Sequence, residues 1–393
     1  MIATNRVLGL RTISAVSVGS SLVILFVRGR DSLLRLPSDP GYSYIEDAAR
    51  NGLFSLNQGD PYFHVVARFL AWVTSWFPLS WQAVVLASLV HLVWGGCAMT
   101  ISRVVKLESK STTMALLAGA LLVAAPHASE SSIGNVGNVK WPLLASVIVI
   151  CSSGLAIRHF RVTSLGLMLV AGLTNPLTVL CLVPLTALSC RMRSKASHAL
   201  LLGGVCLSIF LIQVIKVGGS AVLSGQSTRV ARPWEGMGIF WWSGWVGPIV
   251  ISLAIITTLS SISRPLNLLN RFEFLLAAAA FVTAVASYLM GGIGDRYFVL
   301  PTTISLIALI LTIRGLVISE RVKRIVLVFT LIGIFVPTVK WFDTGWYMTG
   351  GPTWNSEVKR ANESCITQSS SVVELFLSPN GSVELDCQYV LRG

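Results

Sequence analysis

Carboxylates gather early in the chain, in the stretch SDPGYSYIEDAARNG at 38–52. Asp39 is followed there by the adjacent pair Glu46 and Asp47. Neighbouring residues of a helix point about 100° apart, so the pair can take separate roles, one as a general base and the other as a metal ligand or orienting group. A carboxylate in a partly dry site deprotonates a sugar hydroxyl well. The alternative is a solvated loop with acidic residues at a helix start.

Two polar side chains stand out in the aromatic stretch DPYFHVVARFLAWVTSWFPL at 60–79. His64 and Arg68 are four residues apart, so a helix places both on one face. Asp60 and Pro61 are typical of an N-cap followed by the first helical residue. The pattern predicts a helix that lies at the membrane interface and offers His64 or Arg68 to a substrate. An ordinary belt of aromatic residues is the alternative.

A third group of polar residues is SESSIGNVGNVKW at 129–141, which holds Glu130, Asn135, Asn138, Lys140 and Trp141. Asparagine amides suit sugar hydroxyls, because each amide offers a donor and an acceptor. Gly134 and Gly137 of this stretch allow the backbone to approach a bound group, and Lys140 can bind a phosphate. Polar packing between helices is the alternative.

The stretch GDRYFVLP at 294–301 places Arg296 at the mouth of an apolar run, between Asp295 and Tyr297. An arginine there is costly unless it binds an anion or pairs with a carboxylate. Its fork suits a lipid-linked phosphate, with Arg232 adding positive charge nearby. A structural ion pair of Arg296 with Asp295 or with Glu130 is the alternative.

The elements that must position these groups are membrane helices. Hydrophobic residues make up 53% of the 393 residues and charged residues 12%, against about 25% charged in soluble domains. Mean hydropathy is +0.73. Apolar runs of this length form helices in lipid, where every backbone N–H needs a partner within its own segment. An all-α polytopic fold is therefore predicted, with eleven spans at about 12–28, 81–101, 112–126, 141–157, 162–174, 177–190, 198–216, 239–260, 273–291, 297–313 and 324–339.

Loop charges give the orientation. With the N-terminus inside, the short inner gaps carry the excess of lysine and arginine behind the net charge of +13. This is the positive-inside pattern, so the basic pI reports topology and needs no nucleic-acid partner. A multi-pass protein of the plasma or inner membrane is predicted, with the C-terminus outside. The long first loop (29–80), the later polar groups and Asn175, between two short spans, then all face the extracytoplasmic side.

The tail after the last span is a separate small unit. We expect an integral membrane domain over 1–340 and an extracytoplasmic tail over 341–393. Cys365 and Cys387 are the two of seven cysteines that lie outside apolar or membrane-flanking segments. In an oxidising compartment a disulfide between them would contribute about 3 kcal/mol. Two free thiols are the alternative.

Two pairs of motifs carry a resemblance. IEDAARNG followed by GDPYFHVVAR resembles the acidic first-loop region of polyprenyl-phosphate-sugar-dependent mannosyltransferases of the GT-C superfamily. SIGNVGNVKW and DRYFVLP are similar to segments of an actinobacterial branch of membrane proteins grouped with that superfamily. The order of the pair here, Glu46 before Asp47, leaves the identity of the base open.

The resemblance implies an inverting transfer of one hexose or pentose from a polyprenyl phosphate to an envelope glycan, lipid or protein, outside a lipid bilayer. Glu46 or Asp47, with Asp39 less favoured, would be the base, and a divalent cation is the one cofactor considered. The remaining candidates would bind donor or acceptor: His64, Arg68, Glu130, Asn135, Asn138, Lys140, Trp141, Asn175, Arg232, Asp295, Arg296 and Tyr297.

Two other classes of protein fit the same features. A flippase or transporter of lipid-linked sugars would line a path with polar groups, although such proteins often show internal repeats and no convincing repeat is present here. A non-catalytic protein of envelope polysaccharide assembly would use the outer groups as an interface. No P-loop, GxGxxG or GxSxG motif and no zinc-site spacing occurs in the chain, which counts against soluble nucleotide chemistry.

Overall fold

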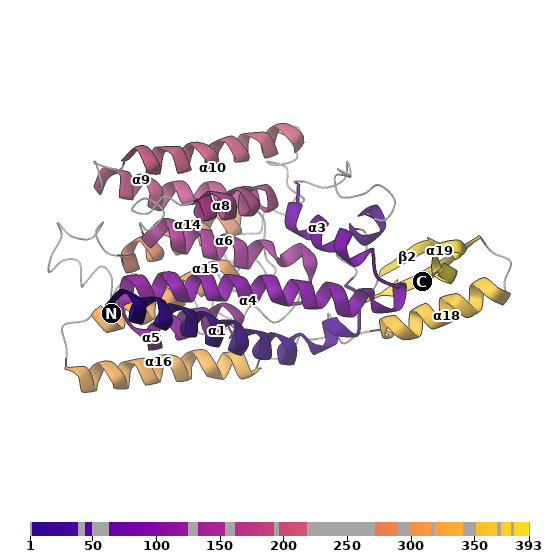
Figure 1. Cartoon of the computed structure of the whole chain (residues 1–393), viewed down its shortest axis with the longest axis horizontal. Helices are drawn as coiled ribbons and strands as arrows, with labels where there is room; N and C mark the ends of the chain where they lie inside the picture. Colours follow the sequence, from indigo (N-terminus) through magenta and orange to yellow (C-terminus); the bar gives the residue numbers. More distant parts are fainter. Residues whose placement is uncertain are drawn as a thin grey trace.

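Figure 1 shows a computed structural model of the chain, in which helices pack side by side and a small mixed module extends from one end. The structure describes residues 2–37, 44–48, 63–124, 133–153, 162–191, 196–217, 272–289, 299–315, 319–340, 351–367, 371–378 and 381–392. The predicted span 239–260 lies outside these residues, as do Asp39, Glu130, Arg232, Asp295, Arg296 and Tyr297.

Each other predicted span overlaps a described helix. The bundle helices are α1 (Ile2–Arg28), α4 (Gln82–Ser109), α5 (Thr112–Ala124), α6 (Lys140–Ser153), α8 (Val162–Thr174), α9 (Leu182–Arg191), α10 (Ala196–Val217), α14 (Phe272–Leu289), α15 (Val299–Gly315) and α16 (Glu320–Lys340). Shorter elements connect them: the 3-10 helices η1 (Arg30–Leu33), η2 (Leu79–Trp81), η4 (Val136–Asn138) and η5 (Pro176–Cys181), and helix α3 (Val65–Thr74).

Apolar character identifies the bundle as a membrane domain. Among the described residues, 4 helices are long and apolar enough to cross a bilayer: Gly9–Arg28, Leu79–Ser109, Val136–Ser153 and Ala196–Ile215. Shorter apolar helices pack beside them, and α15 is buried on all sides from Val299 to Ile313. The helical membrane character expected from the sequence is therefore present. The count of eleven spans and the orientation remain predictions.

Small polar residues form one of the described contacts between helices of the bundle. Ser17 of α1 and Ser102 of α4 place their hydroxyl oxygens 2.8 Å apart in the buried interface. A Cβ atom at Gly119 of α5 would overlap the Ser102 hydroxyl, so glycine lets α5 approach the other two helices. Close packing of small residues in this way is a common means of association between membrane helices.

The C-terminal module (351–392) is folded and contains strands. It consists of α18 (Trp354–Thr367), β1 (Val372–Leu377), β2 (Gly381–Asp386) and α19 (Cys387–Arg392). The strands pair antiparallel, with Val372 opposite Asp386 and Leu377 opposite Gly381. The all-α prediction is wrong for this segment, because β1 alternates exposed and buried residues as a half-buried strand does.

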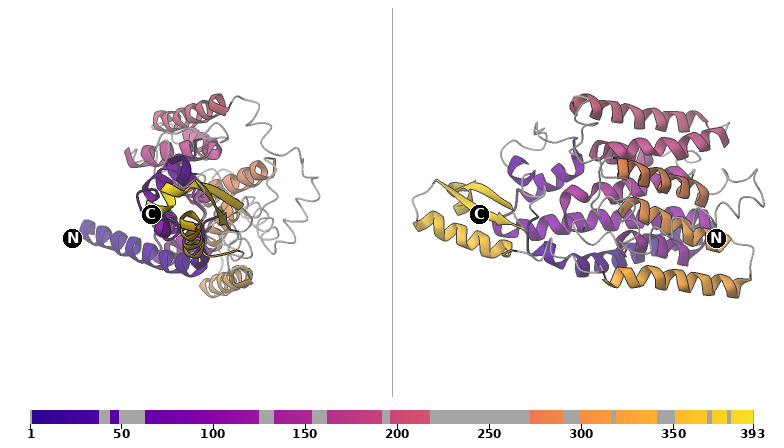
Figure 2. Two further views of the ribbon diagram at one scale, coloured as in Figure 1. Left: turned by 90° about the vertical axis from the view of Figure 1, so that its right-hand side faces the viewer. Right: turned by 180° about the vertical axis from the view of Figure 1, so that it is seen from behind.

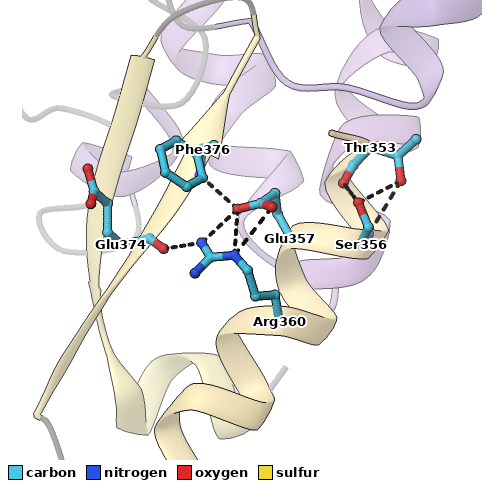
Figure 3. A network of polar contacts seen from close by, with 6 residues as sticks. All are labelled: Thr353, Ser356, Glu357, Arg360, Glu374 and Phe376. Atoms are coloured by element: carbon cyan, nitrogen blue, oxygen red, sulfur yellow. Dashed lines mark hydrogen bonds and ion pairs between the residues drawn. The ribbon is translucent and has the colours of Figure 1, made fainter. Parts of the chain in front are cut away.

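A disulfide and an ion pair hold the module together. The sulfurs of Cys365 and Cys387 are bonded, which is the bridge expected from their positions in the sequence. Glu357 of α18 accepts hydrogen bonds from Arg360 Nη2 at 2.7 Å and from the backbone N–H of Phe376 at 3.1 Å (Figure 3). Arg360 also donates to the Glu374 carbonyl at 2.6 Å, and its hydrogen bond to Glu357 raises its pKa above the ordinary value. These contacts tie α18 to β1.

The two chain ends lie at opposite ends of the molecule (Figure 2). The N-terminus of α1 is at one end of the bundle, and the C-terminal module is at the other. The end that carries the module also carries the end of α1 and the start of α4, and with them the described residues 29–37 and 75–81 of the first loop. We call this the loop end. It is the end for which the basic loops predict an extracytoplasmic location.

Candidate functional site

An ion pair joins two separate parts of the first loop. Arg68 of α3 donates from Nη1 to Asp47 Oδ2 at 2.8 Å, and the two side chains are only 7% and 10% exposed. Arg68 Nε also donates to the Phe63 carbonyl at 3.0 Å, and the guanidinium lies 5.4 Å from the Tyr44 ring centroid. Asp47 belongs to a short helical segment, 44–48, that also contains half-buried Glu46. The first-loop cluster is Tyr44, Asp47, His64 and Arg68.

His64 stands directly before α3 with an unusual backbone. Its φ of 49° and ψ of 39° lie in the left-handed region, which costs a non-glycine residue about 1–3 kcal/mol. Its side chain is buried, and its ring centroid lies 5.6 Å from that of Tyr44. The helix expected to start at Asp60 and Pro61 therefore starts at Val65, so His64 lies before it and does not share its face with Arg68. The backbone N–H of Arg68 donates to the His64 carbonyl.

Two polar side chains from the bundle support the start of α3. The backbone N–H of Val66 donates to Thr174 Oγ1 at 3.3 Å, and that of Phe63 donates to Gln213 Oε1 at 3.1 Å. The first N–H groups of a helix have no partner within the helix, so Thr174 fills that need for Val66. The bond to Gln213 holds the backbone just before α3. Sequence reasoning missed both residues. The clue to Gln213 is that its side chain is the one amide in the mainly apolar α10.

Asn175 lies at the break between α8 and η5. Its side-chain oxygen accepts from the backbone N–H of Leu177 at 3.0 Å, which caps η5. Its side-chain nitrogen is buried and has no hydrogen-bond acceptor among the described residues. A buried donor without an acceptor costs about 1–3 kcal/mol. The predicted bend between the two short spans is thus a real interruption of the helix, with a polar group at its corner.

The SIGNVGNVKW motif is used for internal packing in the described residues. Asn135 and Asn138 are buried, and their side-chain oxygens accept from Gly137 N at 2.9 Å and from Trp141 Nε1 at 3.2 Å. Both bonds lie within the motif and do not join separate helices. Half-buried Lys140 lies with its Nζ 5.2 Å from the Trp141 ring centroid. It remains the member of this motif best placed to meet an anion.

Gly134 explains how this motif reaches the first loop. Its φ is 79°, which favours glycine, and a Cβ atom there would overlap the side chain of Ser32 in η1. The backbone therefore passes directly over η1, and η4 then lies against α3. Through these contacts the motif, Asn175 and the first-loop cluster share the loop end of the bundle. Arg296, which was expected to join them, lies outside the described residues.

Two further buried residues at this end were not singled out from the sequence. Arg28, the last residue of α1, is fully buried and donates from Nη1 to the Val123 carbonyl at 2.6 Å. His91 of α4 is also fully buried, with its ring edge-on to Phe26 and both ring nitrogens without a hydrogen-bond partner among the described residues. A buried charge at the end of a membrane helix is by default a candidate functional group.

Comparison with known proteins adds no family. No protein-family model matches the chain, and no curated protein is significantly similar to it. Among the described residues, no three histidine, cysteine, aspartate or glutamate side chains are grouped to hold a metal ion. The structure shows a helical bundle, compatible with a membrane protein, that has a polar, partly ion-paired loop end.

Proposed function

We propose that the protein is an inverting glycosyltransferase that moves one sugar from a polyprenyl phosphate to an extracytoplasmic acceptor. The observation that carries the proposal is the Asp47–Arg68 ion pair, which holds the helical segment containing Glu46 against α3 at the loop end of a membrane bundle. A donor with a lipid tail and a polar head fits such a place, where apolar helices and polar side chains meet.

We assign the base to Glu46 and a positioning role to Asp47. The Asp47 carboxylate accepts a charge-assisted hydrogen bond from Arg68, which suits it to holding the segment against α3. Glu46 is the adjacent residue on the same short segment, so the ion pair fixes the backbone from which Glu46 projects. In this proposal Asp47 positions the segment and Glu46 accepts the proton.

The proposed reaction is a single displacement at the anomeric carbon. The acceptor oxygen forms a bond to that carbon as the bond from carbon to the phosphate oxygen breaks. Glu46 takes the acceptor's proton, and the polyprenyl phosphate leaves as an anion. Lys140 is the described cation at the loop end that we assign to the neighbourhood of this phosphate, together with the sequence-predicted Arg296 and Arg232.

The experiment is a transfer assay with a matched carboxylate control. Purified protein in lipid nanodiscs is incubated with a panel of polyprenyl-phosphate hexoses and pentoses and with envelope glycan, lipid and peptide acceptors, and products are identified by mass spectrometry. Transfer by the wild type and its loss in Glu46→Gln support the proposal. Equal transfer by both proteins rejects the assigned base.

The same preparation separates the two other classes of protein. Movement of a labelled lipid-linked sugar across vesicles without a glycosylated product would identify a transporter. Neither transfer nor movement, together with stable capture of an envelope polymer, would identify an assembly protein. Either result would overturn the proposed function.

A further inference from the structure

One residue of the C-terminal module bonds both ends of the first loop. The backbone N–H of Trp354 donates to the Leu34 carbonyl at 2.7 Å, and its indole Nε1 donates to the Leu79 carbonyl at 2.6 Å. Leu34 follows the end of α1, and Leu79 begins η2 immediately before α4. The Trp354 side chain is itself 2% exposed. This tryptophan therefore joins the entry and the exit of the loop at one point.

Further contacts join the module to the entry side of the loop. The Ser378 N–H donates to the Leu36 carbonyl at 3.0 Å, and Pro37 forms a parallel β-bridge with Ser378, so the loop entry extends the hairpin edge. Arg35 donates from Nε to the Gly351 carbonyl at 3.3 Å. Backbone carbonyls accept most of these bonds, which makes the contact sensitive to loop conformation more than to loop side chains.

The exit side is joined through α19. Gln82, the first residue of α4, is fully buried and donates from Nε2 to the Tyr389 hydroxyl at 3.1 Å. The disulfide from Cys365 to Cys387 connects α18, which carries Trp354, to α19, which carries Tyr389. The two attachments therefore belong to one covalently closed unit.

We infer that the C-terminal module is a positioning element for the first-loop cluster, with Trp354 as its principal residue. The cluster lies between the two attachments: Tyr44 and Asp47 follow the entry at Pro37, and His64 and Arg68 precede the exit at Leu79. Fixing both ends reduces the conformational freedom of the chain between them, which lowers the entropy cost of forming the Asp47–Arg68 pair. The link from position to catalysis rests on the proposed function.

Hydrogen exchange measured by mass spectrometry tests the positional claim without any activity. We expect Trp354→Ala to raise the exchange rate about tenfold in peptides covering 34–37 and 44–48, with little change in α5 and α6. Trp354→Phe keeps an aromatic ring and removes only the indole donor to Leu79, so a smaller rise in the same peptides is expected. Reduction of the disulfide in the wild-type protein supplies a third perturbation that needs no substitution.

Ile366→Ala is the matched control, because Ile366 lies on the same helix as Trp354 and is 72% exposed. It should leave exchange in the first loop unchanged. The inference is overturned if Trp354→Phe and disulfide reduction raise exchange only within 351–392, because the module would then be attached to the loop without holding it. If Trp354→Ala cannot be purified, these two perturbations still decide the question.

The transfer assay separates this inference from the proposed function. Slower transfer by Trp354→Phe, alongside faster loop exchange, supports both. Faster loop exchange with unchanged transfer overturns the link between module and site and leaves the proposed function standing. Absence of transfer by the wild type overturns the proposed function, while the exchange result still decides whether the module positions the loop.

Discussion

Asp47 and Arg68 form a buried ion pair at 2.8 Å between two parts of the first loop that are 21 residues apart in sequence. The pair brings the acidic segment and α3 together, and Arg68 is further fixed by its bond to the Phe63 carbonyl. Because both side chains are largely buried, each charge is stabilised by the opposite charge of its partner. The pair is therefore a structural requirement of the cluster, whatever the cluster binds.

The first prediction concerns this dependence. Arg68→Ala or Asp47→Ala should each lower the free energy of unfolding by about 3 kcal/mol, because each removes the ion-pair partner of a largely buried charge. The double variant should lose clearly less unfolding free energy than the sum of the losses in the two single variants. Chemical unfolding in detergent, followed by tryptophan fluorescence, measures all three. Strict additivity would show that the two side chains do not interact.

The second prediction separates the two acids of the segment. Glu46→Gln should slow single-turnover sugar transfer about 10²–10⁴-fold, the usual contribution of a general base, while donor binding is retained. Asp47→Asn should slow transfer less, because the side-chain oxygen of the asparagine can still accept a hydrogen bond from Arg68. Glu320→Gln on α16, which pairs with Lys323 on the surface, is the matched control and should transfer at the wild-type rate. If Asp47→Asn slowed transfer more than Glu46→Gln does, Asp47 would be the base and Glu46 the positioning residue.

The third prediction concerns the crossing of the SIGNVGNVKW backbone over η1. Gly134→Ala should destabilise the protein by about 3 kcal/mol, because it combines a left-handed backbone with overlap against Ser32. Gly96→Ala in α4 is the control, because a Cβ atom there meets nothing within 4 Å. That control should be neutral or stabilising by up to about 1 kcal/mol. Similar melting temperatures for the two variants would contradict the description of this crossing.

The fourth prediction concerns the disulfide. Cys365→Ser should destabilise the C-terminal module by about 3 kcal/mol, since the bridge closes a sequence separation of 22. Limited proteolysis should then cut within 351–392 at lower protease concentration than in the wild type. Cys190→Ser, which removes an exposed free thiol, is the control and should leave the pattern unchanged. An identical digestion pattern for Cys365→Ser would show that the bridge adds no stability.

Sequence patterns were most informative for the helices. Long apolar runs must form helices in lipid, so the described helices follow the predicted spans closely, and the break at Asn175 was expected from the sequence Thr-Asn-Pro. The hairpin of the C-terminal module was missed because the tail was read mainly for its cysteines. The stretch VVELFLSPNGSVELD at 372–386, two short runs of strand-forming residues around Pro-Asn-Gly, would have indicated a hairpin.

The site was less predictable because its contacts join distant residues. Spacing predicted one helical face for His64 and Arg68, but α3 begins at Val65 and His64 is the left-handed residue before it. No spacing rule could pair Asp47 with Arg68 across a loop, or bring Gln213 under Phe63 from a helix far along the chain. The amides of Asn135 and Asn138 have the chemistry of sugar ligands, but local turns use the same chemistry, and their bonds here are local.

The bond from the Trp354 indole to the Leu79 carbonyl spans 275 residues of sequence. A ribosome therefore exposes both ends of the first loop long before it adds the tryptophan that joins them, and the intervening helices enter the membrane in that interval. Until Trp354 is added, the nascent polypeptide lacks this hydrogen bond. The disulfide can form only after Cys387, which follows Trp354 in the sequence, has also been added. Maturation of the loop end is thus coupled to completion of translation and to thiol oxidation.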